Sequence, residues 1–201
     1  MISLHDFITD FNLDFPSQPN LLPWEITNSL KEILYGMISE LGDDYKIQDG
    51  VAIHKTATIE NGVVLKQPAI IGENCFVGAN AYFREGVFLG KSVKIGPGCE
   101  IKNSIISSGT AIAHFNYVGN SIVGSNVNFE AGSIAANHYN ERAVKNISVL
   151  YRRQIIDTKS DKFGSLIGDD SRIGANAVLS PGTILEKKSV VKRLELIEQL
   201  K

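Results

Sequence analysis

A period of six residues runs through the middle of the chain and limits its fold more than any other feature. Counted in sixes, the first residue of each step is aliphatic or Phe: Ile53, Ile59, Leu65, Ile71, Val77, Phe83, Leu89, Ile95 and Ile101. The residues four places later are mostly small, namely Ala57, Val63, Ala69, Cys75, Ala81, Val87, Val93, Cys99 and Ile105. The same phase returns near the C-terminus at Ile167, Ile173, Leu179, Leu185 and Val191. A phase held over this length predicts a repeat protein.

The period of six fits neither an α-helix, which repeats every 3.6 residues, nor a single strand, which repeats every two. It fits an all-β solenoid, a parallel β-helix in which an aliphatic side chain points inward from each short strand and a small residue lies inside each corner. Three hexapeptides complete one triangular coil, so residues eighteen apart stack. Each coil buries its aliphatic layer against the neighbouring coils.

The two ends of the chain have a different pattern. The segment "LPWEITNSLKEILYGMISEL" (22–41) has apolar residues at helical spacing, with Pro23 suited to a first turn. The segment 189–201 also reads as a helix. Because solenoid ends need caps, we expect a helical cap over residues 1–50, the β-helix over 51–191 and a C-terminal helix over 192–201; a binding role for the helices is the alternative.

The period slips around one histidine. The step is five residues between Ile101 and Ile106 and again between Val118 and Val123, and His114 lies between the two slips. His114 is either a packed structural histidine or a general base that the slips aim toward a substrate.

A long interruption separates the two parts of the repeat. The period stops after Asn137 and resumes at about Ser165, which predicts an extended loop at about 138–164. Long excursions from a rigid scaffold usually serve function or contact another subunit.

Composition excludes several classes of protein. With a formal net charge of −2, the chain is not expected to bind nucleic acid or a membrane surface. It lacks an apolar run long enough for a membrane span and lacks a secretory signal, so a cytoplasmic location is expected. Cys75 and Cys99 are twenty-four residues apart and fall on different corners, so both are expected to be small buried residues and not a disulfide.

The central residues resemble a known family. The stretch "EIKNSIISSGTAIAHFNYVGNSIVGSNVNFEAGSIAANHYN" (100–140), with "FREG" before it and "DKFGSLIGDDSRIGANAVL" after it, resembles the acetyltransferase domain of bifunctional N-acetylglucosamine-1-phosphate uridyltransferases and related sugar nucleotidyltransferases. The likeness covers about residues 83–179. It implies a left-handed parallel β-helix that transfers an acetyl group from acetyl-CoA to an amino-sugar phosphate or nucleotide sugar, with the acyl-CoA cleft between subunits of a homotrimer.

The resemblance also assigns roles by position. His114 matches the catalytic base and Glu100 matches a glutamate beside it. The residues matching the substrate-binding positions are Arg84, Lys102, Tyr117, Asn128 and Lys162. The residues matching the acyl-CoA pantetheine positions are Ala131, Asn137 and Ala175.

Several residues depart from the family pattern, which puts the identity of the substrate in doubt. Glu85 replaces a preferred Pro, Ala113 and Glu130 replace Gly, and His138 replaces a Tyr. The loop at 138–161 is longer than in the family, so Lys162 is matched only across a gap. A nucleotidyltransferase domain is not expected, since about 50 residues precede the repeat and they contain no Gly-rich phosphate loop.

The chemistry of acyl transfer suits these residues. A neutral imidazole can take the proton from an attacking amine at physiological pH, and backbone N–H groups can stabilise the tetrahedral oxyanion. Arg84 and Lys102 are eighteen residues apart and are expected to stack facing the same way. Two like charges without a shared partner repel, and a bound phosphate would relieve that repulsion. Glu100, Tyr117, Asn128 and Lys162 have the alternative of being ordinary surface residues.

Other functions remain open at this point. The β-helix could be a non-catalytic scaffold that binds sugar nucleotides, or a sugar acyltransferase that uses acyl carrier protein. A zinc site like that of the β-helical carbonic anhydrases is not expected, because the four histidines offer no close ligand pair.

Overall fold

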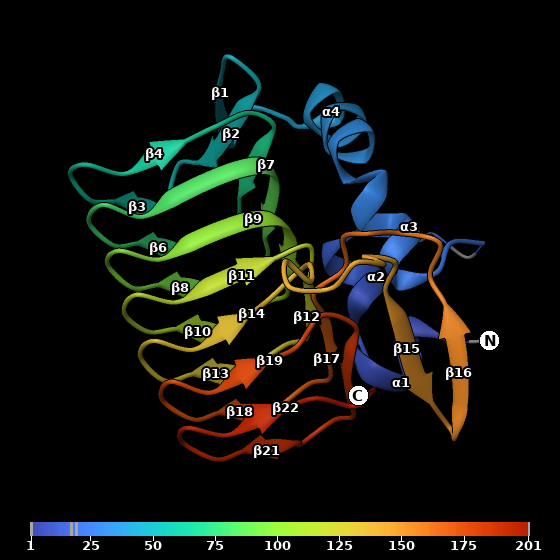
Figure 1. The fold of residues 1–201 in the computed structure, drawn as a ribbon. Coiled ribbons are helices and arrows are strands. Elements are labelled where there is room, and N and C mark those ends of the chain that lie inside the picture. Colours follow the sequence, from blue (N-terminus) through green and yellow to red (C-terminus); the bar gives the residue numbers. More distant parts are fainter. Residues whose placement is uncertain (1, 17, 19, 201) are drawn as a thin grey trace.

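The structure, a computed structural model, describes residues 2–16, 18 and 20–200 and is a three-sided parallel β-solenoid (Figure 1). Side I consists of β4 (Val64–Leu65), the first part of β7 (Tyr82–Leu89), the first part of β9 (Glu100–Ile106), β11 (Tyr117–Gly119), β14 (Ile134–Ala135), β19 (Val178–Leu179) and β22 (Leu196–Ile197). Side II consists of β2 (Val51–His54), β5 (Ala69–Ile71), the second parts of β7 and β9, β12 (Ile122–Val123), β17 (Ser165–Ile167) and β20 (Thr183–Leu185). Side III consists of β3 (Thr58–Ile59), β6 (Phe76–Val77), β8 (Lys94–Ile95), β10 (Ala111–Ile112), β13 (Asn128–Phe129), β18 (Arg172–Ile173) and β21 (Val190–Val191). The predicted parallel β-helix is confirmed.

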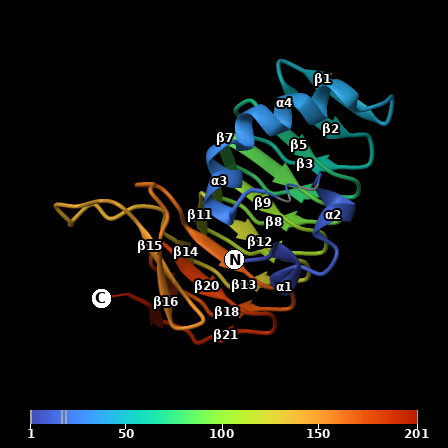
Figure 2. The same cartoon turned by 90° about the vertical axis from the view of Figure 1, so that its right-hand side faces the viewer.

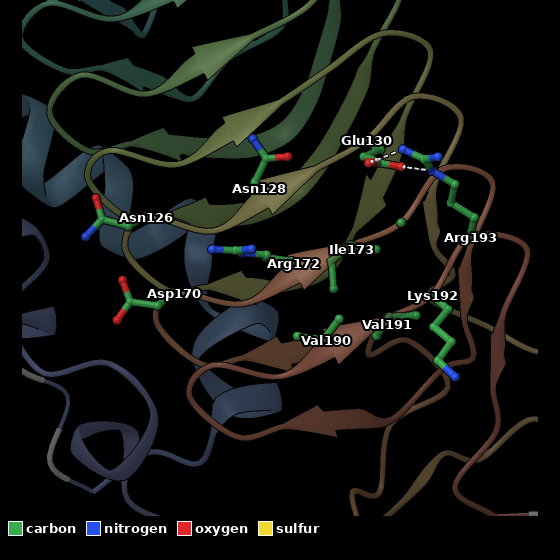
Figure 3. Close-up of a pocket in the computed structure, with 11 residues that line it drawn as sticks. Asn126, Asn128, Glu130, Asp170, Arg172, Ile173, Val190, Val191, Lys192 and Arg193 are labelled. Atoms are coloured by element: carbon green, nitrogen blue, oxygen red, sulfur yellow. Dashed lines mark hydrogen bonds and ion pairs between the residues drawn. The ribbon is translucent and has the colours of Figure 1, made fainter.

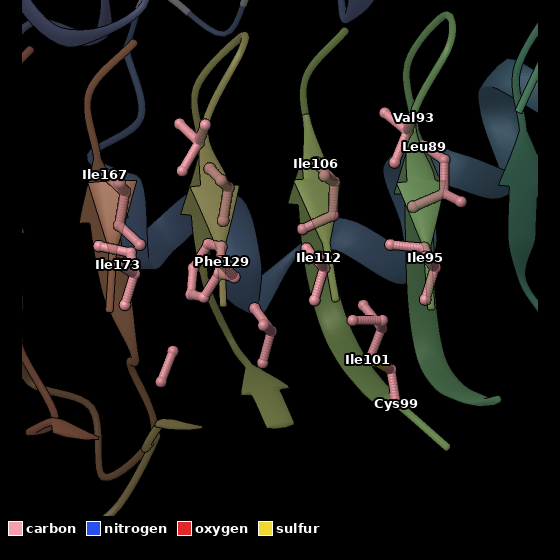
Figure 4. Packing of buried hydrophobic residues seen from close by; sticks show 14 of the residues in the cluster. Leu89, Val93, Ile95, Cys99, Ile101, Ile106, Ile112, Phe129, Ile167 and Ile173 are labelled. Carbon is pink, nitrogen blue, oxygen red and sulfur yellow. The ribbon is translucent and has the colours of Figure 1, made fainter. Parts of the chain in front are cut away.

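The inward residues follow the six-residue period. Parallel pairing stacks Ile53 on Ile71 and Ile71 on Leu89, eighteen residues apart, as predicted. Figure 4 shows the aliphatic side chains of successive coils in one interior column, among them Leu89. Each fully buried aliphatic side chain contributes roughly 1.5–3 kcal/mol through the hydrophobic effect. Cys75 and Cys99 are buried in the interior of the solenoid and do not form a disulfide, as predicted.

One bulge marks the place where a coil with the regular six-residue step meets the coils with the shorter step. Between Arg84 and Val87 the register of β7 against β9 shifts, because Glu85 and Gly86 form an extra step with φ of 61° and 101°. The extra residue in one strand is the defining property of a β-bulge. The next coils stack residues seventeen apart, as in the pairing of Lys102 with Gly119.

Side II is covered by segments from outside the solenoid. Its outward residues are apolar and buried, namely Ala52, Ile70, Phe88, Ile105, Ile122, Leu166 and Ile184. The segments that cover it are α1 (Leu4–Phe7), α2 (Phe11–Asp14), α3 (Pro23–Asn28), α4 (Leu30–Glu40) and the hairpin of β15 (Ser148–Tyr151) and β16 (Gln154–Asp157). Figure 2 looks onto this layer. Within it, Phe15 meets Phe88 edge-on at 5.3 Å between ring centroids, and Trp24 meets Phe163 at 5.7 Å.

Two expectations about the additions need correction. The N-terminal helices do not cap the end of the solenoid but lie along side II (Figures 1 and 2). The edge strand at the N-terminal end of the solenoid is β1 (Tyr45–Gln48), which pairs antiparallel with β2. The excursion at 138–164 leaves the coil as predicted, but it folds back as the β15–β16 hairpin and packs on the same side.

The predicted C-terminal helix is wrong. Residues 190–197 form β21 and β22, which pair with β18 and β19 and extend the solenoid. Val191 is buried, whereas Leu194 is 80% exposed. The spacing of three that connects Val191, Leu194 and Ile197 suits a helix, but a spacing of six also connects Leu185, Val191 and Ile197. Stacking on the preceding coil buries Leu185 and Val191 and partly buries Ile197.

Within the described ranges, none of the helices has the length and apolar character that a bilayer crossing needs.

Candidate functional site

His114 lies on the corner where side III turns into side I. The carbonyl of the residue at this place accepts a backbone hydrogen bond from the coil that follows. We call this row the corner ladder, and its members include Ala79, Pro97, His114, Ala131 and Ala175. Arg193 has the same place on the last coil, since Leu194 after it donates to the Ala175 carbonyl. The His114 carbonyl accepts from Gly132 N–H at 2.9 Å, and the Ala131 carbonyl accepts from Asn176 N–H at 3.0 Å. The structure therefore stacks the predicted base and two predicted acyl-CoA positions, Ala131 and Ala175, on successive coils.

The His114 side chain is exposed. Its carbonyl accepts a second hydrogen bond, from Asn116 Nδ2 at 3.2 Å, which holds the backbone in place. Among residues 2–16, 18 and 20–200, no side chain hydrogen-bonds the imidazole. The His114 ring is therefore not packed within this chain, and it is accessible to a ligand.

The residue after His114 has an unusual backbone for its type. At this corner the residue after the ladder position is left-handed on each coil, with φ of 60° at Asn80, 56° at Phe115, 55° at Asn176 and 61° at Leu194. Glycine and Asn adopt this conformation easily, whereas a bulky side chain pays about 1–2 kcal/mol. Phe115 is also 73% exposed. Strain of this kind collects at functional sites.

Four charged side chains meet on side I, and we call them the charge cluster: Arg84, Glu85, Glu100 and Lys102. Arg84 and Lys102 stack on adjacent coils, as predicted. Arg84 Nε donates to Glu100 Oε1 at 2.7 Å and its NH1 donates to Glu85 Oε1 at 2.9 Å. Glu85 Oε2 lies 3.3 Å from Lys102 Nζ. Both cations therefore have carboxylate partners within the protein. Their repulsion is relieved without the bound phosphate that the sequence suggested.

Glu85 was not among the candidates, although it joins both cations. Partial burial favours its neutral form, but Lys102 and Arg84, with Lys31 nearby, hold the pKa of the Glu85 carboxyl below its ordinary value. Its φ of 61° is closed to the proline that the resembling family prefers here. The departure from the family pattern therefore changes both the charge and the backbone of this loop.

Tyr117 and Asn137 form a second group on side I. A Cβ at Gly119 would lie 2.5 Å from Tyr117 Oη and 2.9 Å from Asn137 Cγ, so only glycine leaves room for both. Burial, then the nearby Glu100 charge, raises the pKa of the Tyr117 hydroxyl. Asn137 Nδ2 donates to Asn120 Oδ1 at 2.6 Å. Asn137 follows β14 while Ala131 precedes it, so the structure groups Asn137 with Tyr117 and not with the corner ladder.

Lys162 lies beside the same edge of side I, next to a residue that is hydrogen-bonded to it. The next residue, Phe163, donates its N–H to the Asn137 carbonyl at 3.1 Å, while the Lys162 side chain is exposed.

Asn128 is on a different side of the solenoid. It lies on β13 of side III and lines an open groove of about 900 Å³, together with Asp170, Arg172 and Val190 (Figure 3). The structure does not bring Asn128 together with the charge cluster of the same chain.

One edge of this groove reaches the corner ladder. Figure 3 shows Arg193 beside Glu130, which it contacts through two hydrogen bonds of 2.7 and 2.8 Å. Glu130 Oε2 also accepts the Ala175 N–H at 2.9 Å. These bonds, first from Arg193 and then from the Ala175 amide, lower the pKa of Glu130 to about 2. The Glu130 carboxylate therefore already accepts the hydrogen bond of the Ala175 N–H, which belongs to one of the predicted acyl-CoA positions.

The described part of the chain contains no group of three or more His, Cys, Asp or Glu residues placed to hold a metal ion.

Comparison with known proteins assigns the family. Residues 69–150 match the family described as GMPPB C-terminal domain, and residues 166–192 match the hexapeptide repeat of succinyl-transferase. A protein of Escherichia coli K12 named "Putative uncharacterized acetyltransferase YaiX" is 31% identical over 187 residues, which cover 92% of this chain and 80% of that protein. The chain belongs to the hexapeptide-repeat acyltransferases.

Larger relatives contain this region as one part. The bifunctional sugar-1-phosphate nucleotidylyltransferase/acetyltransferase of Sulfurisphaera tokodaii is 36% identical over 80% of this chain and 41% of its own length. The bifunctional protein GlmU of Clostridium kluyveri is 34% identical over 74% of this chain and 34% of its own length. The chain thus matches well under half of each of these two relatives.

Two features of this family member lay outside the predicted site. Glu85 completes the charge cluster and Phe115 stands exposed beside His114. The signal for Phe115 was present in the sequence, because Asn or Gly fills the equivalent place on most neighbouring coils.

Proposed function

We propose that this hexapeptide-repeat acyltransferase moves an acetyl or short acyl group from acyl-CoA to an amino-sugar phosphate or nucleotide sugar, with His114 as the general base. The observation that carries the proposal is the exposed His114 on the same corner ladder as Ala131 and Ala175. A donor lying along that ladder would bring its thioester past the imidazole. We also propose a cytoplasmic location for the protein.

The proposed reaction uses few groups. The neutral His114 imidazole takes the proton from the acceptor nitrogen or hydroxyl as it attacks the thioester carbonyl, and the CoA thiolate leaves. Arg84 and Lys102 lie on the neighbouring side I, where they would hold the anionic part of the acceptor. Glu100 bonds to Arg84 at 2.7 Å, so we assign it the role of positioning Arg84.

We further propose that the protein is a homotrimer. Side I carries exposed apolar side chains that a second copy would cover, namely Val64, Tyr82, Ile134 and Leu196. Asn128 faces side III while Tyr117 faces side I, so the two can line one cleft only if they come from different copies. Sedimentation that gives a stable monomer at micromolar concentration would contradict this assembly.

The experiment that tests the activity measures thiol release from acetyl-CoA, with and without glucosamine 1-phosphate or an amino nucleotide sugar. Thiol release that depends on the acceptor is expected. A scaffold predicts binding of the sugar without thiol release, and an enzyme dependent on acyl carrier protein predicts turnover only with an acyl carrier protein donor. Either result would replace the proposal.

A further inference from the structure

The charge cluster holds a carboxylate in the place where the proposed function needs a phosphate. Glu85 gives one oxygen to Arg84 at 2.9 Å and lies 3.3 Å from Lys102 with the other. A phosphate would use separate oxygens on the same two cations. We propose that Glu85 is an internal competitor for the acceptor's phosphate and thereby determines which acceptors the site takes. This inference rests on the proposed function.

The burial of Lys102 explains why a competitor is present. The Lys102 side chain is 8% exposed, whereas Glu85 and Arg84 are 42% and 31% exposed. A buried ammonium without a counter-charge is costly. Glu85 supplies that counter-charge while the site is empty, and it lies on the solvent side of Lys102, where an incoming anion would arrive.

A β-bulge places Glu85 between Arg84 and Lys102. Glu85 and Gly86 are the extra step of the bulge between Arg84 and Val87, and Glu85 has a φ of 61°. The side chain therefore belongs to neither the inward nor the ordinary outward row of β7. A bulge commonly re-aims a side chain beside an active site, and here it turns a carboxylate onto both cations.

The charge balance defines the favoured acceptor. Arg84, Lys102, Glu85 and Glu100 sum to a formal charge of zero. A phosphate monoester carries about −1.5 to −2 at pH 7, and it must displace Glu85 or accept its repulsion. In the diphosphate of a nucleotide sugar each phosphate is esterified twice and carries one charge, so the phosphate that meets Arg84 and Lys102 is repelled less by Glu85. The site therefore favours a nucleotide sugar over the dianion of a sugar monophosphate.

The test measures binding of glucosamine 1-phosphate by calorimetry, without an acyl donor. Glu85→Gln keeps the shape and removes the charge, and Glu85→Gly keeps the left-handed backbone and removes the side chain. Each variant should bind at least about tenfold more tightly than wild type, because one close negative charge is gone. The matched control is Glu73→Gln, which removes one charge from the exposed Glu73–Lys91 pair at another corner and should leave binding unchanged.

The alternative is that Glu85 only holds Arg84 and Lys102 in position. In that case both Glu85 variants bind glucosamine 1-phosphate equally or less tightly than wild type, and the inference is wrong; undetectable binding in every variant also overturns it. In turnover, Glu85→Gln should raise kcat/KM for glucosamine 1-phosphate relative to UDP-glucosamine. Tighter binding without any acyl transfer would sink the proposed function and leave the inference standing.

Discussion

Sides I and II are built by the same coils, and in β7 and β9 by the same strands, yet their outward residues differ in kind. On side II, Phe88 and Ile105 are buried under the N-terminal helices and the hairpin. On side I, Arg84 and Glu100 of the same two strands form ion pairs that remain open to solvent. On both sides the inward side chains form the interior core that holds the coils together. The outward residues can therefore differ: those of side II add stability by packing under the cover, and those of side I are available for chemistry.

The largest expected effect separates chemistry from stability. His114→Ala should lower kcat by about 10²–10⁴, the usual worth of a general base, while the melting temperature stays unchanged because the side chain is exposed. The control is His54→Ala, which removes a histidine from side II at the N-terminal end and should leave kcat unchanged. Near-normal turnover in His114→Ala would remove His114 from the mechanism and favour the scaffold alternative.

A substitution under the cover of side II should have the opposite effect: it should lower stability and leave turnover unchanged. Trp24→Ala should lower the free energy of unfolding by about 3–5 kcal/mol, because Trp24 is 2% exposed and packs on Phe163. Denaturant unfolding measures the loss, and kcat per folded molecule should hold. Leu13→Ala is the control, because Leu13 is 83% exposed in the same covering layer and should cost about 0.5 kcal/mol at most. If Trp24→Ala lowers kcat as much as it lowers stability, the two sides are not independent.

A smaller effect is expected at the strained corner positions. Phe115→Asn and Leu194→Asn should each raise stability by about 1 kcal/mol, because Asn tolerates the left-handed backbone that both residues adopt. Only Phe115→Asn should reduce turnover, since Phe115 is next to His114. Equal activity in both variants would mean that the exposed Phe115 ring does not contact a substrate.

The smallest effect concerns acid stability. The pKa of Glu130 is lowered to about 2, so its ion pair stabilises the fold above the unfolded-state value of about 4.3 and is lost as the pH falls toward 2. The melting temperatures of wild type and Glu130→Gln should therefore converge between those pH values. Arg193→Gln should move the loss of stability toward pH 4, because Arg193 is the main cause of the lowered pKa. A constant gap between wild type and Glu130→Gln across this range would contradict the assignment.

The inward column was predictable because a long repeat leaves little choice of phase. Ile71 and Leu89 stack as the eighteen-residue spacing requires. The cover over side II also has a signal in the sequence, since Ile70 and Phe88 are apolar neighbours of inward residues. Two adjacent apolar residues in a short strand imply burial on both faces.

The site was less predictable because it depends on local backbone geometry. The stacking of Arg84 on Lys102 follows from the period, but the pairing of both with Glu85 depends on a bulge that shifts the register. The six-residue period does not predict the direction of a side chain that lies in a bulge. The contact of Asn137 with Asn120 similarly depends on where the excursion leaves and re-enters the coil.

A crystal structure with CoA and an amino nucleotide sugar tests the central claim most directly. The account predicts the pantetheine chain along the corner ladder at Ala131 and Ala175, and the acceptor nitrogen or hydroxyl within about 3.2 Å of the His114 imidazole. It also predicts the acceptor's phosphate against Arg84 and Lys102 on side I. CoA bound away from the corner ladder, or an acceptor beyond the reach of His114, would contradict the proposed reaction.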